Sequence, residues 1–235
     1  PVPVARLVVS FLLEEGDAAV ALTVLERSLL KSPEQSVLHY ELGRACMLLD
    51  DTARAGVALN KALELGLPDK LKAQATRLLR MSLVPGLWIG TTLVEKAIAA
   101  GDLGAALTAV RALVRRVGPV AEAWLMFGIV QHKLGKLGRA ERLLRRAVQY
   151  HEECAEAHRQ LGVVLLQSGR ARDGGAHLER AHSLSPKNAL LLLHLAQASA
   201  LDGRPDLAQQ RVDEAEQLGI DPQLIQAVRR GIRAA

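Results

Sequence analysis

Residues 121–154 read AEAWLMFGIVQHKLGKLGRAERLLRRAVQYHEEC, and residues 155–188 read AEAHRQLGVVLLQSGRARDGGAHLERAHSLSPKN. The two stretches share their opening letters and place small residues and glycines at the same offsets. Extending this register along the chain aligns six segments of 34 residues: 2–35, 36–69, 87–120, 121–154, 155–188 and 189–222. A period of 34 residues indicates stacked helix pairs, each burying its apolar face against its neighbours. The sequence therefore predicts an all-α fold.

Individual slots of the register have physical meanings that agree with this prediction. Two slots must be small because the two helices of a pair approach most closely there. The first slot holds Val9, Gly43, Val94, Gly128, Gly162 and Ala196, and the second holds Ala21, Ala55, Ala106, Ala140, Gly174 and Ala208. Another slot ends the first helix of each pair, where a left-handed backbone favours glycine. It holds Gly16, Gly101, Gly135, Gly169 and Gly203, with Asp50 as the exception.

The pattern resembles the tetratricopeptide repeat. In residues 121–154 the resemblance rests on Trp124, Gly128, Ala140 and Ala147, and in the next segment Pro186 completes it. It covers about 204 of the 235 residues. The resemblance implies an α-solenoid of antiparallel helix pairs, about 14 helices in a right-handed superhelix, that binds other proteins.

The register slips once, after residue 69, by 17 residues, which is half a repeat. Residues 70–84 read as one extra amphipathic helix, with Asp69 as its N-cap and Leu83 on its apolar side. Pro85-Gly86 ends this helix. Two interpretations stay open: the extra helix packs in line as a degenerate repeat, or two arms meet at a joint at Pro85-Gly86. Residues 223–235 are expected to form a capping helix, with these apolar residues on one side: Leu224, Ile225, Val228 and Ile232.

The amino-acid composition excludes several classes of protein. The chain is 49% hydrophobic, which excludes a disordered protein, and its 3% aromatic content argues against base stacking, so we expect no nucleic-acid partner. Cys46 and Cys154 form no disulfide framework, which favours a reducing compartment. No apolar run reaches transmembrane length, and the N-terminal residues are in repeat register. We therefore expect a cytoplasmic protein, with an upstream anchor or signal left open.

A search for catalytic chemistry finds no phosphate-binding loop and no set of residues arranged for catalysis. The trio His151, Cys154 and His158 has spacing that zinc could use, but His158 occupies the tryptophan slot of its repeat and a fourth ligand is missing. We expect no enzyme activity, no metal and no cofactor.

The resemblance, rather than the periodicity, implies which side chains line the concave groove and contact a partner. They are Tyr40, Arg44, Met47, Trp88, Leu125, Ile129, His132, Arg159, Val163, Leu166, Leu193 and Gln197. The Lys/Asn/Arg carboxylate clamp of the chaperone-binding members is absent. The groove across residues 121–201 is instead aliphatic, which favours docking of an apolar helix or extended segment. A tightly curled superhelix that buries part of this stripe is the alternative.

The net charge of +5 falls entirely within residues 87–170, which hold 12 Lys/Arg and 7 Asp/Glu. A basic ridge on second helices is expected from the spacing of Arg111, Arg115, Arg139, Arg142, Arg145 and Arg146. It could contact an acidic protein surface or anionic lipid headgroups, or it is a solvated outer face.

The sequence thus predicts a non-catalytic adaptor that binds a protein or peptide to recruit or assemble a bacterial complex, such as a secretion or pilus, polarity or motility complex. The alternative is a scaffold that assembles with copies of itself through head-to-tail solenoid contacts.

Overall fold

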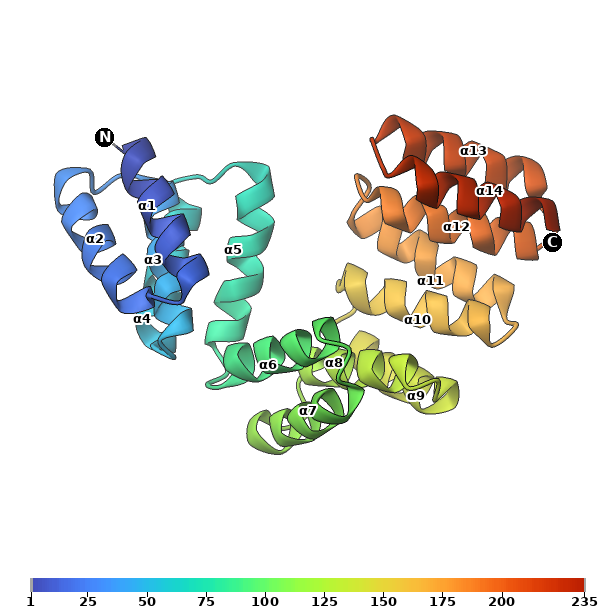
Figure 1. Cartoon of the computed structure of the whole chain (residues 1–235), viewed down its shortest axis with the longest axis horizontal. Coiled ribbons are helices and arrows are strands. Elements are labelled where there is room, and N and C mark those ends of the chain that lie inside the picture. Colours follow the sequence, from blue (N-terminus) through green and yellow to red (C-terminus); the bar gives the residue numbers. More distant parts are fainter. Residues whose placement is uncertain (1, 235) are drawn as a thin grey trace. The chain divides into compact units, whose positions relative to one another are not determined.

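The computed structural model describes residues 2–234 and the side chains of residues 7–232. Within this range the chain forms 14 helices and no strand, so the expected all-α fold is confirmed (Figure 1). The helices are α1 Val2–Glu15, α2 Ala18–Lys31, α3 Ser36–Leu48, α4 Thr52–Glu64, α5 Asp69–Ser82, α6 Leu87–Ala99, α7 Leu103–Val117, α8 Ala121–Lys133, α9 Leu137–Tyr150, α10 Ala155–Gln167, α11 Ala171–Leu184, α12 Ala189–Leu201, α13 Pro205–Gln217 and α14 Pro222–Ala234.

The chain divides into two compact units. The first unit comprises the chain up to Lys96 together with Arg115–Gly118, and the second unit comprises Ala97–Val114 and Pro119 onward. The division therefore falls within α6 and α7. Pro85 and Gly86 lie inside the first unit, so this division does not support a joint at that position. The repeat boundaries stay predictions.

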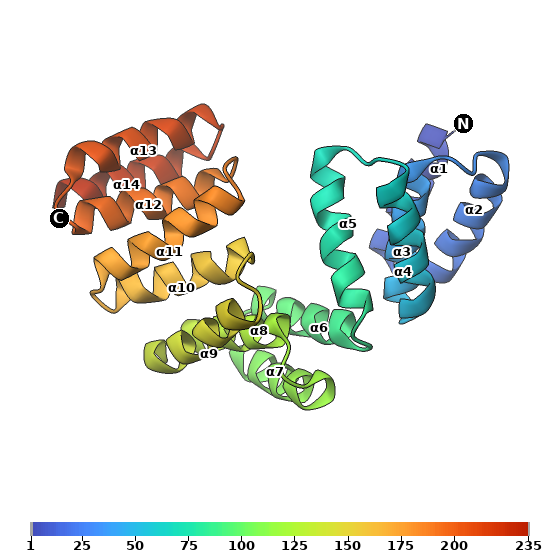
Figure 2. The ribbon, with the colours of Figure 1, turned by 180° about the vertical axis from the view of Figure 1, so that it is seen from behind.

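In the first unit, α1 packs on α2, α3 on α4, and α4 on α5. Leu25 and Leu38 are fully buried where α2 meets α3, while Leu59 and Ala62 of α4 pack against Ala75 and Leu78 of α5. In the second unit, α8 pairs with α9, α10 with α11 and α12 with α13, and α14 covers both α12 and α13. Figures 1 and 2 show α10, α11 and α12 side by side in chain order, with α14 lying against α12 and α13. Each element thus buries its apolar face against its neighbours.

The close approach expected at the small-residue slots is confirmed. A Cβ atom added to Gly43 or Gly128 would lie 2.5 or 2.6 Å from the Cγ of Leu59 or Leu144, respectively, on the paired helix. Between α10 and α11 the neighbour is backbone and not a flexible side chain, because a Cβ on Gly174 would lie 2.8 Å from the backbone oxygen of Gly162. Backbone therefore meets backbone at this crossing.

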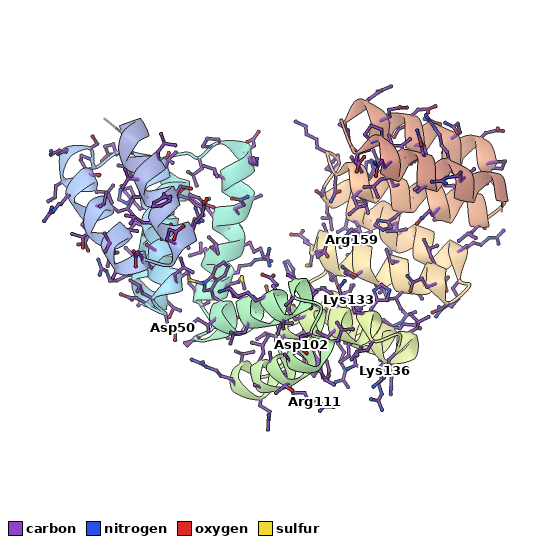
Figure 3. The ribbon with its side chains drawn as sticks, viewed as in Figure 1. Asp50, Asp102, Arg111, Lys133, Lys136 and Arg159 are labelled. Atoms are coloured by element: carbon purple, nitrogen blue, oxygen red, sulfur yellow. The ribbon has the colours of Figure 1, made fainter. Side chains whose placement is uncertain are left out.

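The turn after the first helix of each pair has the expected left-handed backbone. Gly135 has φ +72° and Gly169 has φ +76°. Asp50, between α3 and α4, adopts φ +60° and is the one non-glycine with positive φ among the described residues (Figure 3). The period of the register, rather than the residue type, therefore identifies this conformation.

Replacing Asp50 by Gly is expected to raise the free energy of unfolding by about 0.5–1 kcal/mol, because glycine adopts φ > 0 without a steric cost. The change also removes the ion pair between Asp50 and Arg116, whose N···O distance is 3.5 Å; both side chains are exposed, so its contribution is small. Urea denaturation measures the difference. Asp50→Asn is the control, since it keeps tolerance of this backbone and removes the charge. If both variants lose the same stability, the ion pair outweighs the backbone term.

Two sequence-based details are corrected by the structure. In α5, Asp69 lies in the first helical turn and Pro68 takes the N-cap position, while Leu83 follows the helix with its side chain 75% exposed. The apolar side of α5 passes through Met81 instead. In α14, Leu224 is exposed, while Ile225 and Val228 are buried against α12 and α13. Ala235, the end of the expected capping helix, lies outside the described residues.

Candidate functional site

The first unit contains an open cleft of about 720 Å³, here called the first-unit cleft. Most of its lining comes from α3 and α5, with one residue each from α1 and α6. The lining residues are Ser10, Val37, Tyr40, Glu41, Arg44, Pro68, Lys70, Leu71, Gln74, Arg77, Leu78 and Trp88. Three residues expected in the groove, Tyr40, Arg44 and Trp88, are therefore brought together here.

Polar contacts fix the side chains of α3 in this cleft. The Tyr40 hydroxyl donates to Oε1 of Gln74 on α5 at 2.8 Å. The Arg44 guanidinium donates to the buried Glu41 carboxylate at 2.7 Å and lies 5.9 Å from the centre of the Tyr40 ring. These contacts orient an aromatic ring and a cation before any partner arrives, which lowers the entropy lost on binding.

The cleft combines apolar surface with excess positive charge. Arg44, Lys70 and Arg77 line it, while Glu41 is the single acidic residue of the lining. The Arg77 guanidinium also pairs with Glu95 at 3.5 Å, and both side chains are more than half exposed. The half-buried Trp88 ring packs against the apolar cluster formed by α4 and α5. The arrangement can hold an apolar side chain beside an acidic or polar neighbour.

Helix α5 lies outside the groove positions that the repeat pattern predicts, yet it supplies much of this lining. The residues of α5 that line the cleft, Lys70, Leu71, Gln74, Arg77 and Leu78, recur at helical spacing and form one face. That spacing was available as a signal in the sequence. It was missed because the helix was judged by its apolar side alone.

The aliphatic stripe expected across residues 121–201 is mostly covered by the protein itself. Leu125, Leu166 and Leu193 are only 6%, 9% and 3% exposed, because the first helices α8, α10 and α12 contact one another in succession. Ile129 and Val163 stay half-buried. This burial leaves little apolar area for docking, and the alternative of a tightly curled superhelix stays a prediction.

The polar residues expected in the same groove are partly occupied by contacts within the chain. The His132 ring is hydrogen-bonded to Oε1 of Gln167 at 2.9 Å, and Arg159 donates to both oxygens of Glu156. Gln197 is exposed, and Met47 of the first unit is fully buried. Met47 therefore belongs to the core and not to a binding surface.

Five of the six arginines expected in the basic ridge line one pocket of about 470 Å³ in the second unit, here called the arginine pocket. Arg111 comes from α7 (Figure 3), and the remaining four come from α9. Phe127, Gln131 and Leu143 complete the lining. Arg115 is not among the residues that line it. The arginines of α9 are spaced so that several lie three or four residues apart, which places them on one helix face. This spacing was enough to predict from the sequence that these cations lie together.

One of these cations belongs to a charge network at the edge of the pocket. Arg145 donates to Glu141 at 2.9 Å, and Arg170 donates to the same carboxylate oxygen at 2.7 Å. These hydrogen bonds lower the pKa of Glu141, that from Arg145 most strongly. Glu141 thus stays ionised and holds Arg145 in place.

The trio His151, Cys154 and His158 does not form a metal site. Nε2 of His158 donates to the Glu152 carbonyl at 3.0 Å, and its Nδ1 lies 3.0 Å from Nδ1 of His177. Because both ring nitrogens are engaged, His158 has none left for a metal. Burial lowers the pKa of both rings, which favours the neutral forms that this pair of contacts requires. Among the described residues, no group of three or more His, Cys, Asp or Glu is placed to hold a metal ion.

Comparisons with known proteins support the fold. A family model for the tetratricopeptide repeat matches residues 12–69, 91–140 and 125–189, which is more than half of the chain. A search of the curated proteins found no match. None of the described helices is both long and apolar enough to cross a membrane.

Several solved structures are similar. YrrB, a tetratricopeptide-repeat protein with an unusual peptide-binding site, is 18% identical with a TM-score of 0.53, over 88% of this chain and 97% of YrrB. PilW, a type IV pilus biogenesis factor, is 15% identical with a TM-score of 0.54, over 96% of this chain and 97% of PilW. At these identities the likeness shows the fold alone. A mutant O-GlcNAc transferase from Thermobaculum terrenum is 25% identical with a TM-score of 0.55, over 58% of this chain and 26% of the transferase.

Proposed function

Because the chain belongs to the tetratricopeptide repeat family, whose members are generally non-catalytic scaffolds that bind protein partners, we propose that it is a protein-binding module that holds a partner segment in the first-unit cleft. The cleft takes the place of the apolar stripe across residues 121–201 as the main docking surface. We propose further that binding recruits or assembles a bacterial complex in the cytoplasm.

The observation that carries this proposal is the juxtaposition of Arg44 and Trp88, both partly exposed, beside the buried Tyr40 ring in one open cleft. Tryptophan, tyrosine and arginine are the residue types that most often dominate the binding energy of protein interfaces. Tyr40 and Arg44 are already held by Gln74 and Glu41, so they are preorganised. The volume of about 720 Å³ suits a few side chains of a protein segment.

The chemistry of the lining indicates the kind of segment. Leu71 and Trp88 are partly exposed and offer apolar contact, while Lys70 and Arg77 lie on the same face of α5 as Leu71. A segment that places an apolar or aromatic side chain next to a carboxylate would contact both the apolar residues and the cations of the lining. The relatives YrrB and PilW support a binding or assembly role by analogy with what their names state. Self-assembly into a scaffold stays a prediction with no observation in its favour.

Site-specific photo-crosslinking tests the proposal. A photoreactive residue placed at Ser10, which lines the cleft from α1, is expected to crosslink a protein in cell extract, whereas one at Thr76, exposed on α5 but outside the lining, is not. Trp88→Ala is then expected to lower capture of that protein by about tenfold, because an interface anchor is truncated.

The matched control for Trp88→Ala is Leu83→Ala, which truncates a large apolar side chain that is exposed and outside the cleft. Circular dichroism checks that both variants fold. Gln74→Ala provides a second test of the cleft, because it removes the hydrogen bond that holds Tyr40 without truncating an aromatic ring, and it is expected to lower capture. Equal capture by the wild type, Trp88→Ala and Gln74→Ala would exclude the first-unit cleft as the binding site.

A further inference from the structure

The arginine pocket in the second unit has features of a second binding site, separate from the first-unit cleft. We propose that it binds a short acidic segment of a partner protein, in which an apolar side chain lies between carboxylates. The carboxylates contact the arginines of α7 and α9, the apolar side chain contacts Phe127 and Leu143, and a backbone N–H of the segment donates to Gln131. This goes beyond the proposed function, which rests on the other unit.

Contacts among the described residues neutralise only part of the positive charge of the pocket. Of the five arginines, Arg145 is paired with Glu141, and the Arg146 guanidinium lies 5.1 Å from the centre of the Trp124 ring. Arg139 and Arg142 are exposed, and no described carboxylate pairs with either. Positively charged guanidinium groups on one helix face repel one another, and a bound carboxylate relieves that repulsion while accepting two parallel hydrogen bonds.

The inner wall supplies an independent indication of a ligand. Gln131 lines the pocket and is only 3% exposed, yet its side-chain oxygen has no hydrogen-bond partner among the described residues. A buried acceptor without a partner is costly, and a donor from a bound ligand removes that cost. Phe127 and Leu143 are half-buried and provide the apolar part of the lining. A ligand that fits must therefore carry negative charge, an N–H or O–H donor and an apolar group.

The spread of the cations favours a protein segment over a small anion. Arg139 and Arg146 are seven residues apart on α9, which corresponds to about 10 Å along the helix axis. An extended chain covers that distance in about three residues, with side chains alternating between its two faces. A single phosphate group reaches only one end of such a row. An acidic segment of a protein meets the charge, the donor and the apolar requirement together.

Calorimetric titration of the full chain with the blocked peptide DEFED tests the proposal. DEFED is expected to bind, and the neutral peptide NQFQN, which has nearly the same shape, is expected to bind at least about tenfold more weakly. The affinity for DEFED should also fall with added salt, because the arginines are exposed. Binding of both peptides with equal affinity would overturn the proposal.

Substitutions in the arginine pocket test whether DEFED binds there. The double variant Arg139→Gln/Arg142→Gln is expected to weaken DEFED by about tenfold or more, while the control Arg172→Gln/Arg204→Gln, which removes the same charge around Asp202 outside the pocket, stays within about twofold of the wild type. Gln131→Leu should weaken DEFED several-fold without lowering the melting temperature. An equal loss in the control, or no loss in Gln131→Leu, would contradict the assigned contacts.

Two further ligands separate other anions from a protein segment. Inorganic phosphate is expected to compete with DEFED only at concentrations far above those of the peptide, and vesicles containing anionic lipid are expected not to bind through Arg139 and Arg142. Competition by phosphate at equal concentration, or vesicle binding without peptide binding, would show that the pocket recognises phosphate groups instead. Because the peptide is supplied directly, this test is independent of the crosslinking at Ser10.

Discussion

Gly174→Ala is expected to lower the free energy of unfolding by about 2 kcal/mol, whereas Gly175→Ala, the next residue of α11, is expected to raise it by about 1 kcal/mol. Both substitutions replace glycine by alanine within a helix, so helix propensity stabilises both variants equally. The opposite signs of the changes in the free energy of unfolding are therefore due to packing. A Cβ on Gly174 would lie 2.8 Å from the Gly162 backbone oxygen, and backbone cannot move aside as a flexible side chain can. A Cβ on Gly175 would meet only Ala198, at an ordinary 3.7 Å.

Thermal denaturation of the two variants gives a direct comparison. A difference of about 3 kcal/mol corresponds to melting temperatures on the order of 10 °C apart in a chain of this length. Alanine occupies the equivalent slot in α4, α9 and α13, so the prediction is specific to the α10–α11 crossing. Equal stability of the two variants would mean that α10 and α11 can separate by a few tenths of an ångström at negligible cost.

Lowering the pH from about 7.5 to about 5 is expected to reduce the stability of the second unit by about 2 kcal/mol through His194 alone. Burial lowers the pKa of His194 from its ordinary value of 6.5 to about 4, and the nearby Arg159 acts in the same direction. The unfolded chain therefore takes up a proton first. Stability is fully present above pH 6.5 and is lost as the pH falls from 6.5 toward 4. His158 and His177, with lowered pKa values, add to the same trend.

The variant His194→Leu separates this contribution from the others. Burial of the His194 ring lowers its pKa more than the backbone hydrogen bond with Leu190 raises it, so replacement by leucine removes the titrating group responsible for this pH dependence. Urea denaturation at pH 7.5 and pH 5 should show a pH dependence that is smaller in the variant by about 2 kcal/mol. His39→Leu in the first unit is the control. If that variant flattened the pH dependence equally, the assignment to His194 would be wrong.

Much of the fold could be predicted from the sequence because each slot of the repeat has a local physical requirement. Gly128 and Gly162 were expected where helices cross closely, and there a Cβ would clash with the paired helix. Asp50 shows how specific the register is, since it adopts the left-handed conformation expected of a glycine in that slot. These features depend on contacts within one helix pair. Because the same contacts recur in every repeat, they leave a repeating pattern in the sequence.

The binding surfaces could be predicted only in part, because they depend on how successive pairs pack. The residue pattern of one repeat does not predict that α8, α10 and α12 contact one another in succession and cover Leu125 and Leu193. The arginines of α9 were grouped correctly, since helical spacing alone places them on one face. The orphaned oxygen of Gln131 was not predicted, because its burial depends on helices that the pattern does not position.

The side-chain hydrogen bonds that join one helix pair to the next have a consequence for how the chain folds. They connect residues separated by between 28 and 35 positions: Tyr40 with Gln74, Arg54 with Glu26, His132 with Gln167, Arg170 with Glu141, and Arg211 with Glu179. Each contact closes a loop about one repeat long, so the entropy lost in closing it is nearly the same along the chain. Low contact order of this kind favours rapid folding. No single nucleus is then required: any helix pair that forms first is a template on which its sequence neighbours add, and folding spreads outward by parallel routes.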